Sequence, residues 1–272
     1  MVTLKEIRAD RERTLAEAMS RRPEAELRRS VDALLASRLE GGTPRREFAA
    51  ALKRPNGPHL IAEVKKASPS AGLIRADYNP GALARGYAEA GAGAISVLTE
   101  PTFFKGSLDH LRQVRAAVQL PLLRKDFIFH SYQLLEAVEA GADAALLIVA
   151  MLSPDELRGL HEQARALGLD CLVEVHEESE LREALALGVN LVGINNRSLK
   201  TMRVDLETTF QLLPKVRAGV AVVSESGIRS RADVERLGQA GVSAVLVGEA
   251  LMRSPDPGAA AAALLSRPPK AD

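Results

Sequence analysis

From residue 60 onward, short apolar segments alternate with longer amphipathic ones. The apolar segments are rich in Val, Ile, Leu and Ala, and a loop, an amphipathic stretch and a Gly follow most of them. Short runs that are apolar on both faces are typical of strands in a parallel sheet covered by helices. The pattern predicts strands at 60–65, 94–98, 121–125, 144–149, 171–175, 191–195, 220–224 and 244–248.

The amphipathic stretches between these strands predict helices. They lie near 80–91, 107–118, 131–141, 153–168, 177–188, 206–217 and 230–241, with a last helix after Pro257. Eight strand–helix units over about 210 residues predict an α/β fold, a closed (β/α)8 TIM barrel. An open, doubly wound sheet is the alternative. It would usually carry a GxGxxG turn after its first strand, which the segment at 65–72 does not contain.

The first fifty residues follow a different pattern. They are rich in Arg, Glu, Ala and Leu, show no strand signal, and predict helices at 3–20, 23–39 and 44–52. We therefore interpret residues 1–50 as an N-terminal helical extension packed on a barrel of residues 51–272. Together they are expected to form one structural domain.

Composition narrows the classes of partner and ligand. A net charge of +1 gives no strong field toward nucleic acid or a membrane surface, and the absence of Trp argues against stacking of single-stranded bases. No apolar run reaches the length of a membrane span, and the charged N-terminus does not resemble a signal peptide, so a cytoplasmic protein is expected. A single Cys and five His without ligand spacing predict neither a disulfide nor a metal site.

Polar residues stand at the ends of several predicted strands. Glu63 and Lys65 are two positions apart, so they point to the same face of their strand. Charges among apolar neighbours are costly unless they are paired or used. In a barrel the carboxyl ends of all strands meet at one face, where active sites lie. We therefore expect one shared mouth, lined by Glu63, Lys65, Lys125, Glu174, Asn195, Arg197 and Glu225.

The last two predicted strands end in Val-Val-Ser-Glu-Ser-Gly-Ile at 222–228 and Val-Leu-Val-Gly-Glu-Ala at 245–250. In barrels, the loops at these positions often hold a phosphate, because Gly lets backbone N–H groups approach the anion. Ser226 could add its hydroxyl. The Glu249 carboxylate would repel a phosphate, so its side chain is expected to turn away while its N–H points inward. Phe104 and Phe127 could wall an aromatic ligand or simply pack at the rim.

Six motifs in order resemble indole-3-glycerol phosphate synthases. They are Ile-Ala-Glu-Val-Lys-Lys-Ala-Ser-Pro-Ser, Leu-Leu-Arg-Lys-Asp-Phe, Leu-Val-Glu-Val-His, Gly-Ile-Asn-Asn-Arg-Ser-Leu, Val-Ser-Glu-Ser-Gly-Ile and Val-Leu-Val-Gly-Glu-Ala-Leu-Met. The resemblance runs from about residue 45 to the end. It implies a lyase of tryptophan biosynthesis that converts 1-(2-carboxyphenylamino)-1-deoxyribulose 5-phosphate to indole-3-glycerol phosphate without a cofactor. The expected partner is this small sugar phosphate, and the expected state is a monomer, with a weak dimer as the alternative.

The resemblance also implies roles for individual residues. Lys125 matches the general acid for ring closure and Glu174 the base, while Lys65 and Glu63 share acid or proton-transfer roles that the sequence does not separate. Asn195 and Arg197 resemble residues that hold the substrate hydroxyls and the ring carboxylate. The remaining matches are wall residues, Ser68, Phe104, Phe127, Leu146, Leu199 and Glu225, and phosphate-binding residues, Ser226, Gly227, Gly248 and Glu249.

Two other functions remain open from the residues alone. Another phosphate-binding barrel enzyme, such as a sugar-phosphate isomerase, would explain the late glycines but not the set formed by Glu63, Lys65, Lys125 and Glu174. A barrel that binds a sugar phosphate without turnover would have no need for both Lys125 and Glu174.

Overall fold

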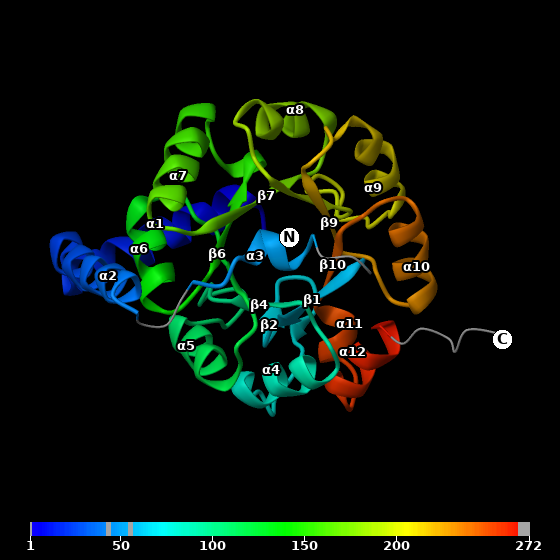
Figure 1. The fold of residues 1–272 in the computed structure, drawn as a ribbon, viewed down its shortest axis with the longest axis horizontal. Coiled ribbons are helices and arrows are strands. Elements are labelled where there is room, and N and C mark those ends of the chain that lie inside the picture. Colours follow the sequence, from blue (N-terminus) through cyan, green and yellow to red (C-terminus); the bar gives the residue numbers. More distant parts are fainter. Residues whose placement is uncertain (1, 42–44, 54–56, 266–272) are drawn as a thin grey trace.

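The computed structural model describes residues 2–41, 45–53 and 57–265. Within these ranges parallel strands close into a barrel in the order β1-β10-β9-β8-β7-β6-β5-β4 (Figure 1). Its strands are β1 (His59–Val64), β4 (Ala94–Leu98), β5 (Leu122–Lys125), β6 (Ala144–Ile148), β7 (Asp170–Val175), β8 (Leu191–Asn195), β9 (Ala221–Glu225) and β10 (Ala244–Val247). The predicted (β/α)8 barrel is therefore confirmed, and each strand begins and ends within one residue of its predicted position.

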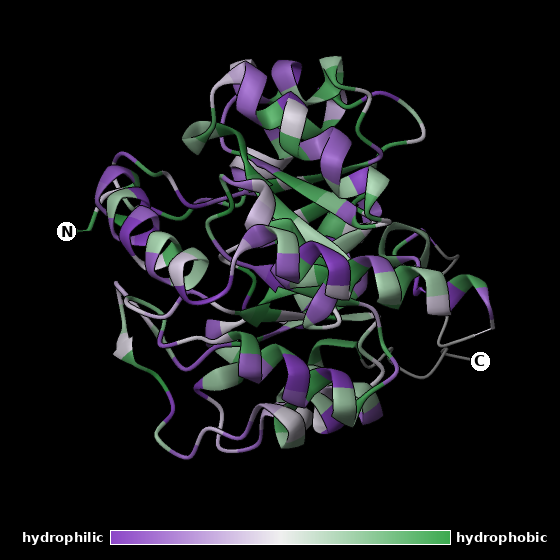
Figure 2. Ribbon diagram, turned by 90° about the vertical axis from the view of Figure 1, so that its left-hand side faces the viewer, coloured by the Kyte–Doolittle hydropathy of each residue, from purple (hydrophilic) through white to green (hydrophobic). Residues whose placement is uncertain are grey.

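Closure of the barrel depends on β1, which pairs with a strand on each side. Ile61 lies opposite Ala94 of β4 and Leu246 of β10. Strand residues are buried on both faces, toward the barrel interior and toward the surrounding helices, as expected for a parallel sheet. Figure 2 shows this arrangement, with hydrophobic segments concentrated in the strands and hydrophilic ones on the outer helices.

Helices follow the strands around the outside of the barrel (Figure 1). They are α4 (Pro80–Glu89), α5 (Leu108–Ala117), α6 (Ser131–Glu139), α7 (Pro154–Ala166), α8 (Glu178–Ala186), α9 (Glu207–Leu212) and α10 (Arg231–Gln239), with α12 (Pro257–Leu265) last. Helix α9 ends earlier than predicted and continues as a 3-10 turn at Leu213–Lys215, because Pro214 cannot donate a helical hydrogen bond. No helix in the described ranges combines the length and apolar character needed to cross a membrane.

Some short elements escaped prediction. A two-stranded hairpin of β2 (Ala67–Ser68) and β3 (Gly72–Leu73) follows β1, and a short helix, α11 (Glu249–Met252), follows β10. A 3-10 turn at Val149–Met151 follows β6. Segments of two to four residues are too short to show a strand or helix period. All three nevertheless lie where the strands leave the barrel, so they shape its mouth.

The N-terminal segment forms α1 (Leu4–Arg21), α2 (Glu24–Leu39) and α3 (Phe48–Ala51). The helix predicted at 44–52 was too long: only α3 is helical, and residues 42–44 lie outside the described part. Helices α1 and α2 lie beside α6, while α3 lies across the centre of the barrel in Figure 1. The Ala49 N–H donates to the Asp170 carboxylate at the start of β7 (2.9 Å), so α3 covers the amino ends of the strands.

Helix α1 is tied to three successive loops at the opposite, carboxyl end of the barrel. Asp10 accepts a hydrogen bond from Thr102 after β4, and Arg8 pairs with Glu156 at the start of α7 (2.7 Å). Between them, Arg11 donates two hydrogen bonds to Asp126, directly after β5, each of 3.1 Å. Asp126 is fully buried and also accepts from Arg124 and Thr99. A buried charge network of this kind fixes the helix against the loops.

Replacement of Arg11 by Met should therefore destabilise the protein. Asp126 would lose one of its two cationic partners in a buried setting, for which we expect a loss of about 3 kcal/mol in the free energy of unfolding, measured by urea titration. Arg13→Met is the matched control, because Arg13 lies on the same helix but forms exposed pairs. Equal unfolding midpoints for the two variants would show that the buried pair does not hold α1.

Candidate active site

The carboxyl ends of the strands surround a single cavity of about 750 Å³. This volume lies in the range of about 300–1,000 Å³ that is common for small-molecule sites. All sixteen residues singled out from the sequence line it, although they come from all eight barrel strands or the loops that follow them. Their convergence follows from the closed parallel barrel, which brings strand ends that are distant in sequence to one mouth.

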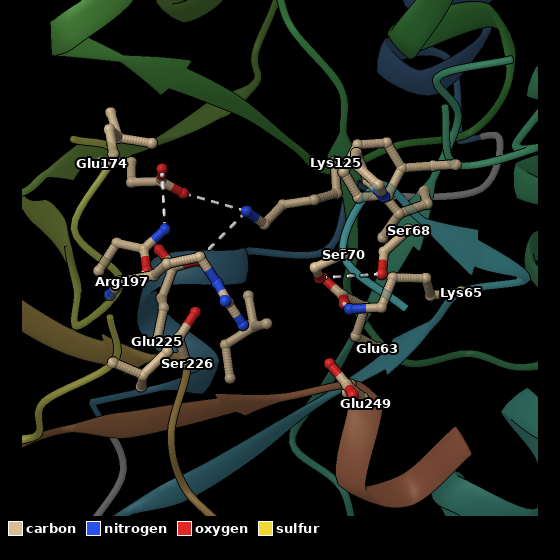
Figure 3. Close-up of a pocket in the computed structure, with 18 of the residues that line it drawn as sticks. Glu63, Lys65, Ser68, Ser70, Lys125, Glu174, Arg197, Glu225, Ser226 and Glu249 are labelled. Carbon is tan, nitrogen blue, oxygen red and sulfur yellow. Dashed lines mark hydrogen bonds and ion pairs between the residues drawn. The ribbon is translucent and has the colours of Figure 1, made fainter. Parts of the chain in front are cut away.

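Lys125, the last residue of β5, occupies the centre of the mouth. Its Nζ lies 3.0 Å from Oε2 of Glu174 and 3.3 Å from Oε2 of Glu225. Figure 3 shows the lysine reaching across the cavity toward both carboxylates. Burial alone would lower the pKa of Lys125, but the charges of Glu174, Glu225 and Glu63 outweigh it and hold that pKa above its usual range. Lys125 therefore carries its proton at neutral pH.

Glu174, on β7, is almost fully buried but well partnered. Its Oε1 accepts a hydrogen bond from Asn195 (3.1 Å), and its Oε2 faces Lys125. Burial favours the neutral carboxyl, but Lys125, His176 and Asn195 together outweigh it and hold the pKa of Glu174 well below its usual range. Glu174 is therefore ionised across the neutral range.

Glu225, on β9, is in the opposite situation. Its Oε1 is buried and has no hydrogen-bond partner among the described residues. Burial raises the pKa of Glu225 to about 7, against the attraction of Lys125 and with the support of the nearby Glu174 charge. The carboxyl occupies space left by Gly193 of β8, where any Cβ would overlap it. The two glutamates that face Lys125 are thus separated in acidity by their surroundings.

A second ion pair lies on β1 and the residue that follows it. Lys65 Nζ contacts Glu63 Oε1 at 2.6 Å, and both side chains are mostly buried. Gly248 leaves room for the Glu63 carboxylate, because a Cβ at this position would overlap it. No group of three or more His, Cys, Asp or Glu side chains that could hold a metal ion was found in the ranges described.

Asn195 and Arg197 project from the end of β8. The Asn195 side chain accepts a hydrogen bond from the Arg197 backbone N–H (3.0 Å) while donating to Glu174. The Arg197 guanidinium lines the cavity and contacts only the Met202 carbonyl, at 3.4 Å, in the hydrogen bonds of the described residues. A planar cation with unused donors is suited to a carboxylate ligand.

The loops after β9 and β10 form another part of the wall. Ser226 and Gly227 both adopt left-handed backbone conformations, with φ of 66° and 86°. Such a conformation is costly for Ser and is often found where backbone N–H groups form an anion-binding nest. The Asn196 side chain donates to the Ser226 carbonyl (3.0 Å) and helps to hold this turn. The Glu249 carboxylate pairs with Arg253 of the following turn (2.9 Å).

Phe104 and Phe127 lie close together on the wall near Lys125. Their ring centroids are 6.0 Å apart and the rings are tilted by 44°. The Phe104 loop is shaped by buried Glu100, which accepts backbone hydrogen bonds from Phe103 and Phe104. The two rings form an apolar wall beside the charged centre.

Two groups of residues at this site were not predicted. The N-terminal segment contributes Val2, Thr3, Leu4 and Ile7 to the cavity wall. A signal was present, since Thr3 and Glu6 form a capping box that marks a helix start, but no local pattern shows which surface that helix covers. His176 lies 3.4 Å from Glu174 Oε1, behind the cavity wall. In the sequence, the sign that His176 could belong to the site is its position directly after the end of a predicted strand.

A family model and the curated relatives agree on one family. A family model described as indole-3-glycerol phosphate synthase matches residues 4–264. Curated relatives with that name include one from Rhodopirellula baltica, 53% identical over 81% of this chain and 85% of its own length. A relative from Polaromonas sp. is 48% identical over 96% of this chain and 97% of its own length. One from Albidiferax ferrireducens is 45% identical over 97% of this chain and 98% of its own length.

Solved structures with a similar backbone are more distant in sequence. A 3-hexulose-6-phosphate synthase from Salmonella typhimurium matches with a TM-score of 0.61 at 14% identity, over 76% of this chain and 96% of that one. A thiamine phosphate pyrophosphorylase from Pyrococcus furiosus matches with a TM-score of 0.58 at 18% identity, over 76% of this chain and 93% of that one. At these identities the likeness shows the barrel fold alone.

The raised pKa of Glu225 predicts a pH-dependent effect of Glu225→Gln on stability. Because the folded protein holds this proton more tightly than the unfolded chain, wild-type stability should fall from about pH 4.5 to 7 as the carboxyl ionises, and the neutral Gln should remove this loss. The free energy of unfolding of Glu225→Gln, relative to that of wild type, should therefore rise by on the order of 2–3 kcal/mol between pH 4.5 and pH 8. Urea unfolding at both pH values provides the measurement. A difference between the two proteins that does not change with pH would contradict the shift.

Proposed function

The chain belongs to the indole-3-glycerol phosphate synthase family, and we propose how the residues of its mouth divide the work of that reaction. The enzyme converts 1-(2-carboxyphenylamino)-1-deoxyribulose 5-phosphate to indole-3-glycerol phosphate, with ring closure and loss of CO2 and water. It is a carboxy-lyase of tryptophan biosynthesis. The observation that carries the assignment of roles is the position of Lys125, a buried cation at the centre of the cavity between two carboxylates.

Ring closure needs a proton where Lys125 is placed. The ring carbon that bears the carboxylate attacks the ribulose C2 carbonyl, and the C=O electron pair moves to the oxygen. An alkoxide is a much stronger base than a lysine amine, so it takes the Lys125 proton even though the pKa of this lysine is raised. CO2 then leaves, and the electrons of its C–C bond restore the aromatic ring. Phe127, two residues after Lys125, packs beside that ring with Phe104.

The proton transfer changes the acidity of Glu174. In the free enzyme Lys125 is the largest influence that holds the pKa of this carboxylate down. When Lys125 becomes neutral, its attraction for the charged carboxylate disappears and the pKa of Glu174 rises. Glu174 is therefore a poor base before ring closure and a better one after it. We assign it to remove the proton from the former C1 methylene during dehydration.

The pair formed by Lys65 and Glu63 completes dehydration. The hydroxyl formed at the former carbonyl carbon must leave as water, which requires an acid. Lys65 can give this proton to the hydroxyl, and the Glu63 carboxylate, 2.6 Å away, can afterwards pass a proton from solvent back to Lys65. Lys65 also lies near enough to the phosphate-binding loops to hold a phosphate oxygen, since Gly248 packs against its partner Glu63.

The remaining residues bind and orient the substrate. The Arg197 guanidinium takes the ring carboxylate, and Asn195 takes a hydroxyl while it holds Glu174. The phosphate binds to the N–H groups of the left-handed turn at Ser226 and Gly227 and to those at Gly248 and Glu249. Ser68, Leu146 and Leu199 complete the wall.

We place this reaction in the cytoplasm, because a phosphorylated substrate does not cross a membrane unaided. We propose that the enzyme acts as a monomer. Three large hydrophobic side chains are exposed in the described part of the chain, namely Leu39, Leu73 and Leu199. They lie on three separate segments, which gives no sign of an apolar surface for a second copy.

Lys125→Met tests the central assignment. The variant keeps most of the volume of the side chain but cannot supply a proton, so kcat should fall by about 10²–10⁴-fold while the far-ultraviolet circular dichroism stays unchanged. The rate is measured by indole fluorescence. Lys66→Met is the matched control, since Lys66 lies nearby over the Tyr78 ring and outside the cavity wall. Turnover by Lys125→Met close to that of the control would exclude Lys125 as the acid.

A further inference from the structure

His176 directly follows β7 and lies between two carboxylates. Its Nε2 is 3.4 Å from Glu174 Oε1, and its Nδ1 is 3.2 Å from Oε2 of Glu180 in the first turn of α8. The backbone N–H of His176 donates to the same Glu180 oxygen at 2.6 Å. The side chain of His176 is only 8% exposed. Glu180 thus fixes the ring from the outside of the barrel, while the other edge of the ring faces Glu174.

The two oxygens of Glu174 have different neighbours. Oε2 faces Lys125 from within the cavity, and Oε1 faces Asn195 and His176. Neither His176 nor Glu180 is among the described residues that line the cavity, so the imidazole approaches Glu174 from behind. The 3.4 Å separation is an ion-pair distance rather than a short hydrogen bond, which suits an electrostatic role.

His176 carries a positive charge in this position. Burial favours the neutral ring, but Glu174 and Glu180 outweigh it and raise the pKa of His176 to about 9. The other charged groups around the pair come from five segments of the chain. Lys125 on β5 and Glu225 on β9 lie on the cavity side, and Glu63 on β1 acts on both of them. Glu177, before α8, and Lys200, after β8, form an exposed pair 3.6 Å apart.

We propose that His176, held by Glu180, is a positioning residue that keeps Glu174 ionised and in place throughout the reaction. A buried carboxylate needs a cationic neighbour, and Lys125 stops being one when it gives its proton to the substrate. His176 remains charged at that point, so Glu174 does not simply take up a proton from solvent before it can accept the one lost in dehydration. The inference rests on the role proposed above for Glu174.

The test combines kinetics with a direct titration. In His176→Gln the carboxyl carbon-13 signal of Glu174, assigned by its loss in Glu174→Gln, should titrate at least one pH unit higher than in wild type. The acidic limb of the pH profile of kcat should also shift to higher pH. At pH 7 we expect kcat to be about tenfold lower than in wild type and KM to stay within twofold. Glu180→Gln, which keeps a hydrogen-bond acceptor beside the ring but removes its negative charge, should shift both in the same direction by less.

His161→Gln is the matched control. His161 is also a buried histidine, but it lies on α7 away from Glu174, so neither the titration nor the pH profile should move. Unshifted Glu174 titration in both His176→Gln and Glu180→Gln would overturn the inference, even if their rates fall. The variant Glu174→Gln tests separately whether Glu174 itself takes part in the reaction. Full activity of that variant would remove Glu174 from the reaction, and the positioning role of His176 would fall with it.

Discussion

The buried ammonium of Lys125 is the interaction on which the mouth of this barrel depends. An isolated charge in this position would be strongly unfavourable, and it is stabilised because Glu174 and Glu225 face it from two other strands. The two carboxylates differ in acidity because Glu174 also has His176 and Asn195 as partners, whereas Glu225 is buried and its Oε1 has no hydrogen-bond partner among the described residues. Glu174 stays ionised and Glu225 titrates near neutral pH. Two carboxylates that face one cation therefore have different acidity in the same cavity.

The alternation of strand β5 connects this centre to the N-terminal extension. Lys125 points into the cavity, while its neighbours Arg124 and Asp126 point outward into a buried network with Arg11 of α1. Helix α1 also supplies residues of the cavity wall at its start, including Ile7. The extension is therefore part of the site as well as part of the fold. It holds the loops after β4, β5 and β6 at the carboxyl end of the barrel, where the cavity lies.

Most of the barrel and the mouth could be predicted from the sequence, because both follow from strong periodic patterns. Once the strand ends were placed, closure of the barrel brought Glu63, Lys125 and Glu174 together without further information. The prediction failed where contacts depend on tertiary packing. Nothing in the α1 pattern shows that it reaches the mouth, and nothing beside His176 shows that its ring turns back to Glu174. The hairpin after β1 and helix α11 are too short to carry a periodic signal.

The most direct measurement is conversion of 1-(2-carboxyphenylamino)-1-deoxyribulose 5-phosphate by the purified wild-type protein, followed by indole fluorescence and by released CO2. The chain contains no Trp, so its own fluorescence background is low. We predict that indole-3-glycerol phosphate and CO2 form in equal amounts, without any added metal or cofactor. A folded protein that binds the substrate but forms neither product would contradict it, because the charged mouth would then be a binding site without the assigned acid and base chemistry.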